Sequence, residues 1–324
     1  MAYDKTAFLG RIGVLMGGPS SEREISIKSG KAVFAALQEK HCDAVPIVLD
    51  STDEHVLVSR LKDEAVDIVF IALHGAFGED GTVQKILEGQ HIPYTGSGSE
   101  ASRVAMNKIS TLERLKTTDV LSPGHVVVSS GEHVDFQELV EKLGGSPLVV
   151  KPASQGSSLG ISIVPSGDVF QEALRHAFAL DQEVLVERYI QGKEITAGIL
   201  GDEALPLVEI RPRCPFFDFQ AKYQTGMSAY IVPAEISSSA TQRVQGLACK
   251  AFQTLGCRDF ARLDFILDRE DNPFFLEANT IPGFTATSLL PMAAREAGYE
   301  FGQLCLRILT LAQEREKITS STLR

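Results

Sequence analysis

The sequence predicts an α/β protein that opens with a parallel sheet and continues with further strands and helices, among them a β-hairpin near the end. In the first third of the chain, short apolar strands alternate with amphipathic helices. In the middle, an apolar strand ending at Lys151 leads into a Gly/Ser-rich loop and a second strand. Near the end, two alternating apolar segments, Ala261–Leu267 and Phe274–Asn279, flank a polar cluster and predict a β-hairpin.

The chain of 324 residues has room for two or three domains. We predict three, with boundaries that give 1–104, 105–190 and 191–324. Charged residues make up 23% and hydrophobic residues 44%, an ordinary globular composition. The net charge of −11 argues against a nucleic-acid-binding protein, because no basic excess is available to meet phosphate backbones.

The chain carries no sign of a membrane or secreted protein. It has no run of 18 apolar residues, the length that spans a bilayer. The N-terminus lacks the apolar core and cleavage site of a signal peptide. The five cysteines are scattered, odd in number and without a C-x-x-C pair, which indicates reduced thiols in a cytoplasmic protein.

The first third alternates strands and helices in the order β-α-β-α-β, which predicts an open parallel sheet. Ser20 or Ser21 is expected to cap the first helix. Ligands of such sheets bind at the carboxyl ends of the strands, where the loops Gly17–Glu24 and His74–Gly81 fall. The expected elements are strands at Arg11–Met16, Ala44–Leu49 and Asp67–Leu73 and helices at Ile25–Leu37 and near Glu54–Lys62.

Three features of this part allow two interpretations each. Glu22 could bind a substrate ammonium or could simply complement the dipole of the first helix, which is worth about 0.3–1 kcal/mol. His74 could contact a ligand, although a single histidine at a strand end is more often structural. The stretch Gly96–Ala101 loosely matches a dinucleotide fingerprint, which is a weak indication of a dehydrogenase.

The middle third contains a loop suited to phosphates. Lys151 ends an apolar strand, where an unpaired cation is costly, so an anion is expected beside it. The loop Gln155–Gly160 offers backbone N–H groups and two hydroxyls, although the sequence has no P-loop motif. The alternative is a tight hairpin with a surface lysine. The other elements are a helix at Met106–Leu115 carrying Lys108, strands at Val126–Val128 and Val184–Ile190, and a helix at Phe136–Leu143.

The predicted hairpin gathers polar side chains. If it is symmetric about its polar connection, Asp264 lies opposite Glu277 and Arg262 lies opposite Asn279. Side chains alternate faces along a strand, so the four share one face, in a patch of roughly 5 Å by 7 Å. Two facing carboxylates and an amide oxygen suit Mg²⁺, with phosphates completing the shell. The alternative is a solvated face with a surface salt bridge to Arg262.

The last third also contains further regular elements. Its tail, Ile318–Arg324, is polar and predicted to be disordered. The expected elements are strands at Glu194–Leu200 and Leu205–Ile210 and helices at Ala240–Leu255, Leu289–Ala297 and Phe301–Glu316.

Taken together, these residues resemble a known family. The two lysines, the loop Q-G-S-S-L-G, Glu187 and the R-x-D…E-x-N hairpin are similar to the ATP-grasp fold. Three longer stretches and the A-K-Y at 221–223 resemble the D-alanine–D-alanine ligase family, over nearly the whole chain. These stretches are G-G-P-S-S-E-R-E-I-S at 17–26, H-G-A-F-G-E-D-G at 74–81 and E-A-N-T-I-P-G-F-T-A-T-S-L-L at 277–290.

The resemblance implies an N-terminal substrate-binding α/β domain and two α+β ATP-grasp domains, the last of them catalytic. ATP would phosphorylate one D-alanine, and the amine of a second would attack the acyl phosphate. The positions that match the family's nucleotide and metal sites are Lys108 and Lys151 for phosphates, Glu187 for adenine, Glu194 for ribose, Lys222 for the γ-phosphate, and Asp264, Glu277 and Asn279 for two Mg²⁺ ions, for which Mn²⁺ may substitute.

The resemblance also assigns the amino-acid sites. Arg262 and the backbone N–H of Gly283 match the groups that stabilise the oxyanion. Glu22, Ser157 and Tyr223 match the first D-alanine site, to which His74 is added as a candidate, and Ser288 and Leu289 match the second. Gln155 departs from the acidic residue usual in the family, which leaves the orientation of the serine loop open. The long segment Arg211–Tyr230 is expected to form a closing lid.

The family further implies a cytoplasmic homodimer that makes a peptidoglycan precursor. One alternative is an ATP-grasp ligase that takes D-serine, D-lactate or another second substrate. Tyr223 argues against the relatives that form depsipeptides. A second alternative is a non-catalytic amino-acid sensor, which the intact metal patch and the phosphate lysines disfavour.

Overall fold

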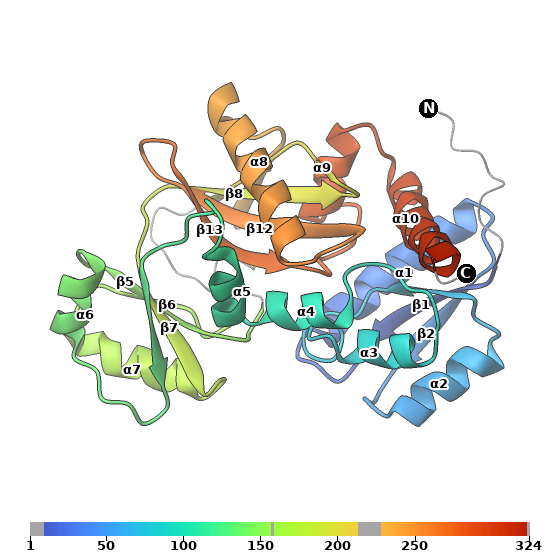
Figure 1. Ribbon diagram of the computed structural model, residues 1–324, viewed down its shortest axis with the longest axis horizontal. Helices are drawn as coiled ribbons and strands as arrows, with labels where there is room; N and C mark the ends of the chain where they lie inside the picture. Colours follow the sequence, from blue (N-terminus) through green and yellow to red (C-terminus); the bar gives the residue numbers. More distant parts are fainter. Residues whose placement is uncertain (1–9, 157–158, 213–227, 323–324) are drawn as a thin grey trace.

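The computed structural model describes residues 10–156, 159–212 and 228–322. Within these residues the strands form three separate sheets with helices packed against them (Figure 1). The first sheet is parallel and the other two are antiparallel. This arrangement confirms the predicted fold class. The boundaries at residues 104 and 190 stay a prediction.

The N-terminal sheet has three parallel strands in the order β2-β1-β3, as the β-α-β-α-β pattern predicts. The loops Gly17–Glu24 and His74–Gly81 follow the carboxyl ends of β1 and β3. They therefore meet at one edge of the sheet. The elements are β1 (Ile12–Gly17), α1 (Arg23–Glu39), β2 (Ala44–Leu49), α2 (Glu54–Asp63), β3 (Ile68–Ile71), α3 (Thr82–Gly89) and α4 (Ser99–Met106).

The start of α1 differs from the prediction. Its N-cap residue is Glu22, which makes no side-chain capping bond, so neither Ser20 nor Ser21 caps the helix. The Ser20 hydroxyl instead donates to the carbonyl of His74 at 2.7 Å and accepts from the N–H of Glu22 at 3.2 Å. Ser20 thus ties the two functional loops together.

The middle sheet is antiparallel, in the order β4-β7-β5-β6. The single helix expected over Met106–Leu115 is divided, because Asn107 leaves α4 and caps α5 with its side chain. The helix α7 was not anticipated. The elements are α5 (Lys108–Leu115), β4 (His125–Ser129), α6 (Phe136–Leu143), β5 (Leu148–Pro152), β6 (Ser162–Val164), α7 (Gly167–Phe178) and β7 (Glu183–Arg188).

The last sheet has six strands, in the order β11-β10-β8-β12-β13 with β9 on β8. The predicted disorder of the tail is wrong in part, since the backbone of the last helix continues to Thr322. The elements are β8 (Lys193–Leu200), β9 (Glu203–Ala204), β10 (Val208–Pro212), β11 (Ser228–Ile231), α8 (Ser238–Thr254), β12 (Phe260–Leu267), β13 (Pro273–Asn279), α9 (Leu289–Glu296) and α10 (Phe301–Thr322).

The segment Arg211–Tyr230, the predicted lid, is not irregular at its ends. Both its ends are strands, since β10 and β11 pair antiparallel with Arg211 opposite Ala229. Residues 213–227, on which the lid prediction mainly falls, lie outside the described residues.

The first and last parts of the chain share one apolar cluster. The helix α10 lies beside α1 over the N-terminal sheet (Figure 1). Phe284, which follows β13, stacks its ring at 5.5–5.7 Å from those of Phe70, Phe260 and Phe301. The loop after β13 is therefore fixed against the N-terminal sheet. None of the described helices is long and apolar enough to cross a membrane.

Candidate functional site

The hairpin of β12 and β13 has the predicted register at its four polar residues. Asp264 lies opposite Glu277, and Arg262 lies opposite Asn279. Beyond Asp264 the register shifts by one residue at a bulge, so that Phe265 pairs with Phe275. The guanidinium of Arg262 donates to Asp264, with Nη2 at 2.8 Å from Oδ2 and Nε at 3.0 Å from Oδ1. The salt bridge of the alternative interpretation is present, but Asp264 is buried rather than solvated.

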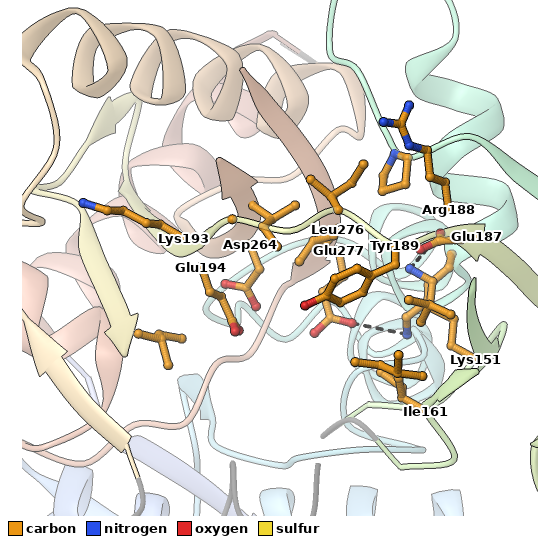
Figure 2. Close-up of a pocket in the computed structure, with 18 of the residues that line it drawn as sticks. Lys151, Ile161, Glu187, Arg188, Tyr189, Lys193, Glu194, Asp264, Leu276 and Glu277 are labelled. Atoms are coloured by element: carbon orange, nitrogen blue, oxygen red, sulfur yellow. Dashed lines mark ion pairs between the residues drawn. The ribbon is translucent and has the colours of Figure 1, made fainter. Parts of the chain in front are cut away.

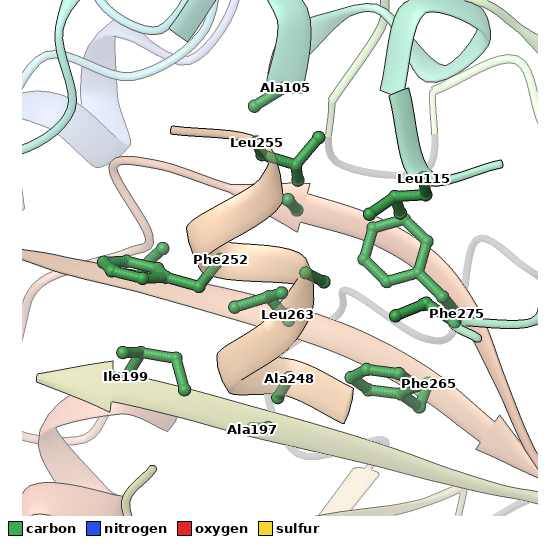
Figure 3. Close-up of a cluster of buried hydrophobic side chains, with 14 of the residues drawn as sticks. Ala105, Leu115, Ala197, Ile199, Ala248, Phe252, Leu255, Leu263, Phe265 and Phe275 are labelled. Carbon is green, nitrogen blue, oxygen red and sulfur yellow. The ribbon is translucent and has the colours of Figure 1, made fainter. Parts of the chain in front are cut away.

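The opposite face of β12 is apolar. There α8 lies across β8 and β12, and Phe252 of the helix and its C-cap residue Leu255 share one apolar cluster with Leu263 and Phe265 of β12 (Figure 3). Burial on this face fixes which side chains of β12 point the other way. Asp264 and Arg262 therefore face a cavity because their neighbours face the core.

A cavity of about 280 Å³ lies between the middle sheet and the last sheet. Its lining combines apolar residues, among them Val149, Ile161 and Leu276, with converging charged groups (Figure 2). A concave site of this kind suits a molecule with an apolar ring and a charged end. The charged lining residues include Lys108, Lys151, Glu187, Glu194, Asp264 and Glu277.

Lys151 and Glu187 form a buried ion pair within this cavity. The Lys151 Nζ lies 2.8 Å from Glu187 Oε1, and the two side chains are 6% and 4% exposed (Figure 2). The anion expected beside Lys151 is thus a carboxylate from the neighbouring strand β7. The alternative of a surface lysine is wrong.

Lys108 links the loop after β5 to the hairpin. Its Nζ donates to the carbonyl of Gln155 at 2.7 Å and lies 3.3 Å from Glu277 Oε2. Burial alone would raise the pKa of Glu277, but attraction to Lys108, Arg262 and Lys151 outweighs burial and lowers this pKa below its usual value. Glu277 is therefore ionised at neutral pH.

A second cavity, of about 150 Å³, adjoins the first where all three parts of the chain meet. Its size suits a molecule no larger than a small amino acid. Lys108 and Glu277 line both cavities. A small molecule in the second cavity would lie next to the anionic end of a larger molecule in the first cavity. The polar lining residues are Glu22, His74, Glu79, Lys108, Gln155, Arg262, Glu277 and Asn279, together with Gly156 and Gly283.

The carboxylate of Glu22 enters this second cavity over Gly75. A Cβ added to Gly75 would lie only 2.6 Å from Glu22 Oε2, and one added to Gly156 would lie 3.8 Å from the same atom. The carboxylate therefore rests between the loop after β3 and the phosphate-suited loop after β5. The carboxylate can therefore bind a cation in the cavity, in addition to complementing the dipole of α1.

His74 is held on both sides of its ring. Its Nδ1 lies 2.9 Å from the carbonyl of Ile281, and because a carbonyl only accepts, Nδ1 donates. Its Nε2 lies 2.9 Å from the hydroxyl of Ser29, which also accepts from the N–H of Phe284 at 3.1 Å. His74 thus positions the segment around Gly283, and its role toward a substrate stays a prediction.

The other predicted site residues either lie outside the described residues or do not line the two cavities. Ser157, Lys222 and Tyr223 lie outside the described residues. Ser288 is the N-cap residue of α9, its hydroxyl accepts from the N–H of Thr285 at 3.0 Å, and that hydroxyl lies 3.4 Å from where a Cβ of Gly283 would be. Neither Ser288 nor Leu289 is among the described residues that line the two cavities.

Sequence reasoning missed Glu79, which lines the second cavity and is buried. Its Oε1 accepts from the N–H of Gly75 at 2.9 Å and lies 3.6 Å from His74 Nδ1. It belongs to the stretch H-G-A-F-G-E-D-G that the sequence already singled out. A glutamate between two glycines in such a loop is a usable signal.

The polar face of the hairpin offers a partial set of ligands for a hard cation. Asp264 and Glu277 supply carboxylates, and Asn279 adds an amide oxygen that already accepts from the N–H of Ile281 at 3.0 Å. Among the described residues, no three His, Cys, Asp or Glu side chains gather at one point. Oxygen donors in this number fit Mg²⁺, which keeps part of its shell for phosphate and water oxygens.

A nucleotide-sized cavity between two antiparallel sheets, with buried lysines and an acidic hairpin, defines an ATP-grasp ligase. Family models described as "D-ala D-ala ligase N-terminus" and "D-ala D-ala ligase C-terminus" match residues 11–65 and 56–97, and residues 123–310, respectively. The chain belongs to the D-alanine–D-alanine ligase family.

Relatives and solved structures agree over nearly the full length. A D-alanine–D-alanine ligase of Pelotomaculum thermopropionicum is 46% identical over 94% of this chain and 97% of its own. A ligase of the same name from Geobacter sulfurreducens is 45% identical over 94% of each chain. The crystal structure of D-alanine–D-alanine ligase from Bacillus anthracis complexed with ATP superposes with a TM-score of 0.84 at 34% identity, covering 96% of this chain and 100% of that one.

Proposed function

We propose that this enzyme joins two D-alanine molecules at the cost of one ATP, releasing ADP and phosphate. The observation that carries the proposal is the placing of Asp264 opposite Glu277 with Arg262 beside them, where the two cavities meet. The larger cavity has the size and the lysines for ATP. The smaller has a carboxylate, Glu22, for an ammonium group.

ATP would lie with its adenine between the apolar walls of the larger cavity. Glu187 would accept from the adenine amino group, and Glu194 would bind the ribose hydroxyls. Lys108 and Lys151 would hold the α- and β-phosphates. To do so they would turn away from Glu277 and Glu187, the carboxylates that they contact in the structure. The γ-phosphate then points to the smaller cavity, since Lys108 lines both cavities.

Asp264, Glu277 and Asn279 would hold Mg²⁺, which supplies positive charge where the γ-phosphate meets a substrate carboxylate. The fit rests on the oxygen-only donor set of this face. Lys108 lies against the carboxylate of Glu277, and Arg262 lies against that of Asp264. These two cations would reduce the repulsion between the two carboxylates and the anionic reactants.

The reaction then proceeds in two transfers. A carboxylate oxygen of the first D-alanine attacks the γ-phosphorus, the bond to the β-phosphate oxygen breaks, and ADP and an acyl phosphate form. The amine of the second D-alanine attacks the acyl carbon and loses a proton, and the C–O bond to phosphate breaks. Arg262 and the N–H of Gly283 would donate to the oxyanion, a role in which one donor is typically worth about 3–4 kcal/mol.

The amino-acid sites follow from the smaller cavity and from the family's motifs. Glu22 would pair with the ammonium of the first D-alanine, beside His74. Ser288 and Leu289 are proposed for the second. Ser157, Lys222 and Tyr223 are proposed from their motifs alone.

The test is ADP release measured by a coupled assay, with products identified by mass spectrometry. D-alanine should support turnover and yield the dipeptide, whereas L-alanine should not. Preferred incorporation of D-serine or D-lactate as the second substrate would move the assignment to a related ligase. Absence of ADP release with every one of these substrates would leave a binding protein and end the proposal.

Two further properties follow from membership of the family. We propose that the enzyme works in the cytoplasm, where it supplies a peptidoglycan precursor. We also propose a homodimer, which sedimentation of the full chain would test by mass.

A further inference from the structure

The hydroxyl of Thr196 is buried and has no hydrogen-bond partner among the described residues. Thr196 lies in β8, in the interior of the six-stranded sheet, and is 1% exposed. Its Oγ1 is out of contact with solvent. A buried hydroxyl left without a partner is destabilising, and such atoms are uncommon in folded proteins. Some other state of the protein is expected to use this hydroxyl.

The register places Thr196 beside the metal-suited face. Thr196 pairs directly with Asp264 across β8 and β12, and Asp264 pairs directly with Glu277 across β12 and β13. Directly paired side chains share a face, with Cβ atoms roughly 4.5–5.5 Å apart. The three residues therefore form one row across three strands.

Among the residues paired with Thr196 or two positions from it along β8, only Asp264 and Glu194 carry side chains that can accept a hydrogen bond, and Glu194 lies roughly 7 Å away along the strand. Val208, its partner in β10, is apolar. Gly198, two residues along the same face, has no side chain, and it lies opposite Arg262. Asp264 is thus the paired residue whose side chain can accept a hydrogen bond from Thr196.

In the structure, Arg262 donates to both carboxylate oxygens of Asp264, so this carboxylate has donors without Thr196. In the proposed reaction, however, Arg262 must turn toward the oxyanion while Asp264 turns toward a cation. The pairing uses Nε and Nη2 of Arg262, and a cation held between Asp264 and Glu277 would draw the Asp264 carboxylate away from these donors. When they separate, the buried Asp264 carboxylate loses its present donors.

We propose that Thr196 is a positioning residue, whose hydroxyl donates to one oxygen of Asp264 when Arg262 moves away and so directs the other oxygen to the divalent cation. This inference rests on the proposed function, because it takes Asp264 as a ligand of the cation. It gives the buried hydroxyl of Thr196 a partner when Asp264 binds the cation. Thr196 itself touches neither cation nor substrate.

A pair of variants separates the hydroxyl from the rest of the side chain. Thr196→Val keeps the shape and removes the hydroxyl, whereas Thr196→Ser keeps the hydroxyl and removes the methyl group. The readouts are Mn²⁺ binding to the enzyme with ADP, followed by electron paramagnetic resonance, and the thermal midpoint of the enzyme without ligand.

Thr196→Val should weaken Mn²⁺ binding about tenfold, the size expected for one hydrogen bond to a charged group. It should also raise the thermal midpoint by about 2 °C, since the cost of the unpartnered hydroxyl disappears. Thr196→Ser should bind Mn²⁺ like the unaltered enzyme. A purely structural threonine would not produce a more stable protein with a weaker metal site.

Equal Mn²⁺ affinity in Thr196→Val and the unaltered enzyme would overturn the inference. If Thr196→Val does not fold, Thr196→Ala against Thr196→Ser makes the same comparison, and equal affinities there would overturn it too. Asp264→Asn is the reference variant. If Asp264→Asn loses Mn²⁺ binding while the Mn²⁺ affinity of Thr196→Val is unchanged, the proposed function stands and only the role of Thr196 is removed. Unchanged Mn²⁺ binding in Asp264→Asn would remove both.

Discussion

The guanidinium of Arg315 forms an ion pair with the carboxylate of Asp259, in which Nη1 lies 2.6 Å from both oxygens. The same carboxylate accepts from the N–H of Gly96 at 2.8 Å, and Arg315 Nη2 donates to the carbonyl of Tyr94 at 2.8 Å. The last helix, the residue before β12 and the loop before α4 are therefore joined at one point. Since Arg262 and Asp264 follow on β12, this joint sets where they lie relative to the N-terminal sheet.

Replacing Arg315 with methionine should destabilise the protein by about 3–5 kcal/mol, because it leaves the Asp259 carboxylate buried without its cation. Asp259 is only 7% exposed. Urea unfolding measures the effect. The matched control is Arg295→Met in α9, an exposed position whose loss should change stability by less than about 0.5 kcal/mol.

The same variant should alter the pH dependence of stability. Burial raises the pKa of Asp259 above its usual value, and Arg315 opposes that rise. A carboxyl whose folded pKa is raised binds more protons when folded, so the stability it contributes falls as the pH rises above about 4. Without Arg315 the rise in pKa is larger, and Arg315→Met should lose more stability at pH 8 than at pH 5. Adding Asp259→Asn, which tolerates the positive φ of 64° at this position, should remove that difference; a difference that persists would contradict the assignment.

The pair of Lys151 and Glu187 allows stability and nucleotide binding to be separated. Lys151→Met should cost about 3–5 kcal/mol, since Glu187 would remain buried without a cation. Adding Glu187→Leu should recover most of that stability in urea unfolding. Titration calorimetry should nevertheless show that neither variant binds ATP. Recovery of ATP binding along with stability would mean that Lys151 serves the fold alone.

Arg262→Ala should lower kcat by about 10²–10³-fold through loss of an oxyanion donor, with the far-ultraviolet circular dichroism unchanged. The control lies on the same hairpin. Arg269 at its turn contacts only Gln191 among the described side-chain partners, at 2.8 Å, and Arg269→Ala should keep nearly full activity. Equal losses in the two variants would indicate damage to the hairpin rather than to the chemistry.

Local patterns in the sequence were enough to predict much of the site. The alternation of apolar residues predicted the two strands, and the assumption that the hairpin is symmetric about its polar connection predicted the register that sets Asp264 opposite Glu277, which the structure confirms. The pattern could not reveal the bulge after Asp264, which leaves no composition signal in so short a strand. The order of strands and helices likewise predicted the parallel sheet.

Contacts between distant parts of the chain were beyond such reasoning. The bond from His74 to the carbonyl of Ile281 joins residues 207 positions apart, and neither residue indicates the other. The partner of Lys151 could be expected to be an anion, but that it is Glu187 depends on which strand lies beside β5. The backbone of α10 runs on to Thr322, beyond Ala312, the last residue of this helix in the apolar cluster that it shares with the N-terminal sheet, and the polar composition of the tail does not reveal this.

Gly75 lies directly beneath the carboxylate of Glu22. Gly75 has a φ of +72°, and a Cβ there would lie 2.6 Å from Glu22 Oε2 and 3.1 Å from Ser20 Oγ. Gly75→Ala should therefore displace the carboxylate and raise the KM for the first D-alanine about tenfold, leaving the KM for ATP unchanged. The variant also strains the backbone, by roughly 1 kcal/mol.

Gly131→Ala isolates that strain, because Gly131 has a φ of +85° and nothing within 4 Å of an added Cβ. Both variants should lose similar stability, but only Gly75→Ala should change the kinetics, measured as ADP release against D-alanine at saturating ATP. If Gly75→Ala alters stability alone, as Gly131→Ala does, then Glu22 does not bind the first substrate. If both variants raise the KM for D-alanine, the kinetic effect comes from backbone strain and says nothing of Glu22. A change in Gly75→Ala alone ties the first D-alanine to the carboxylate that rests on this glycine.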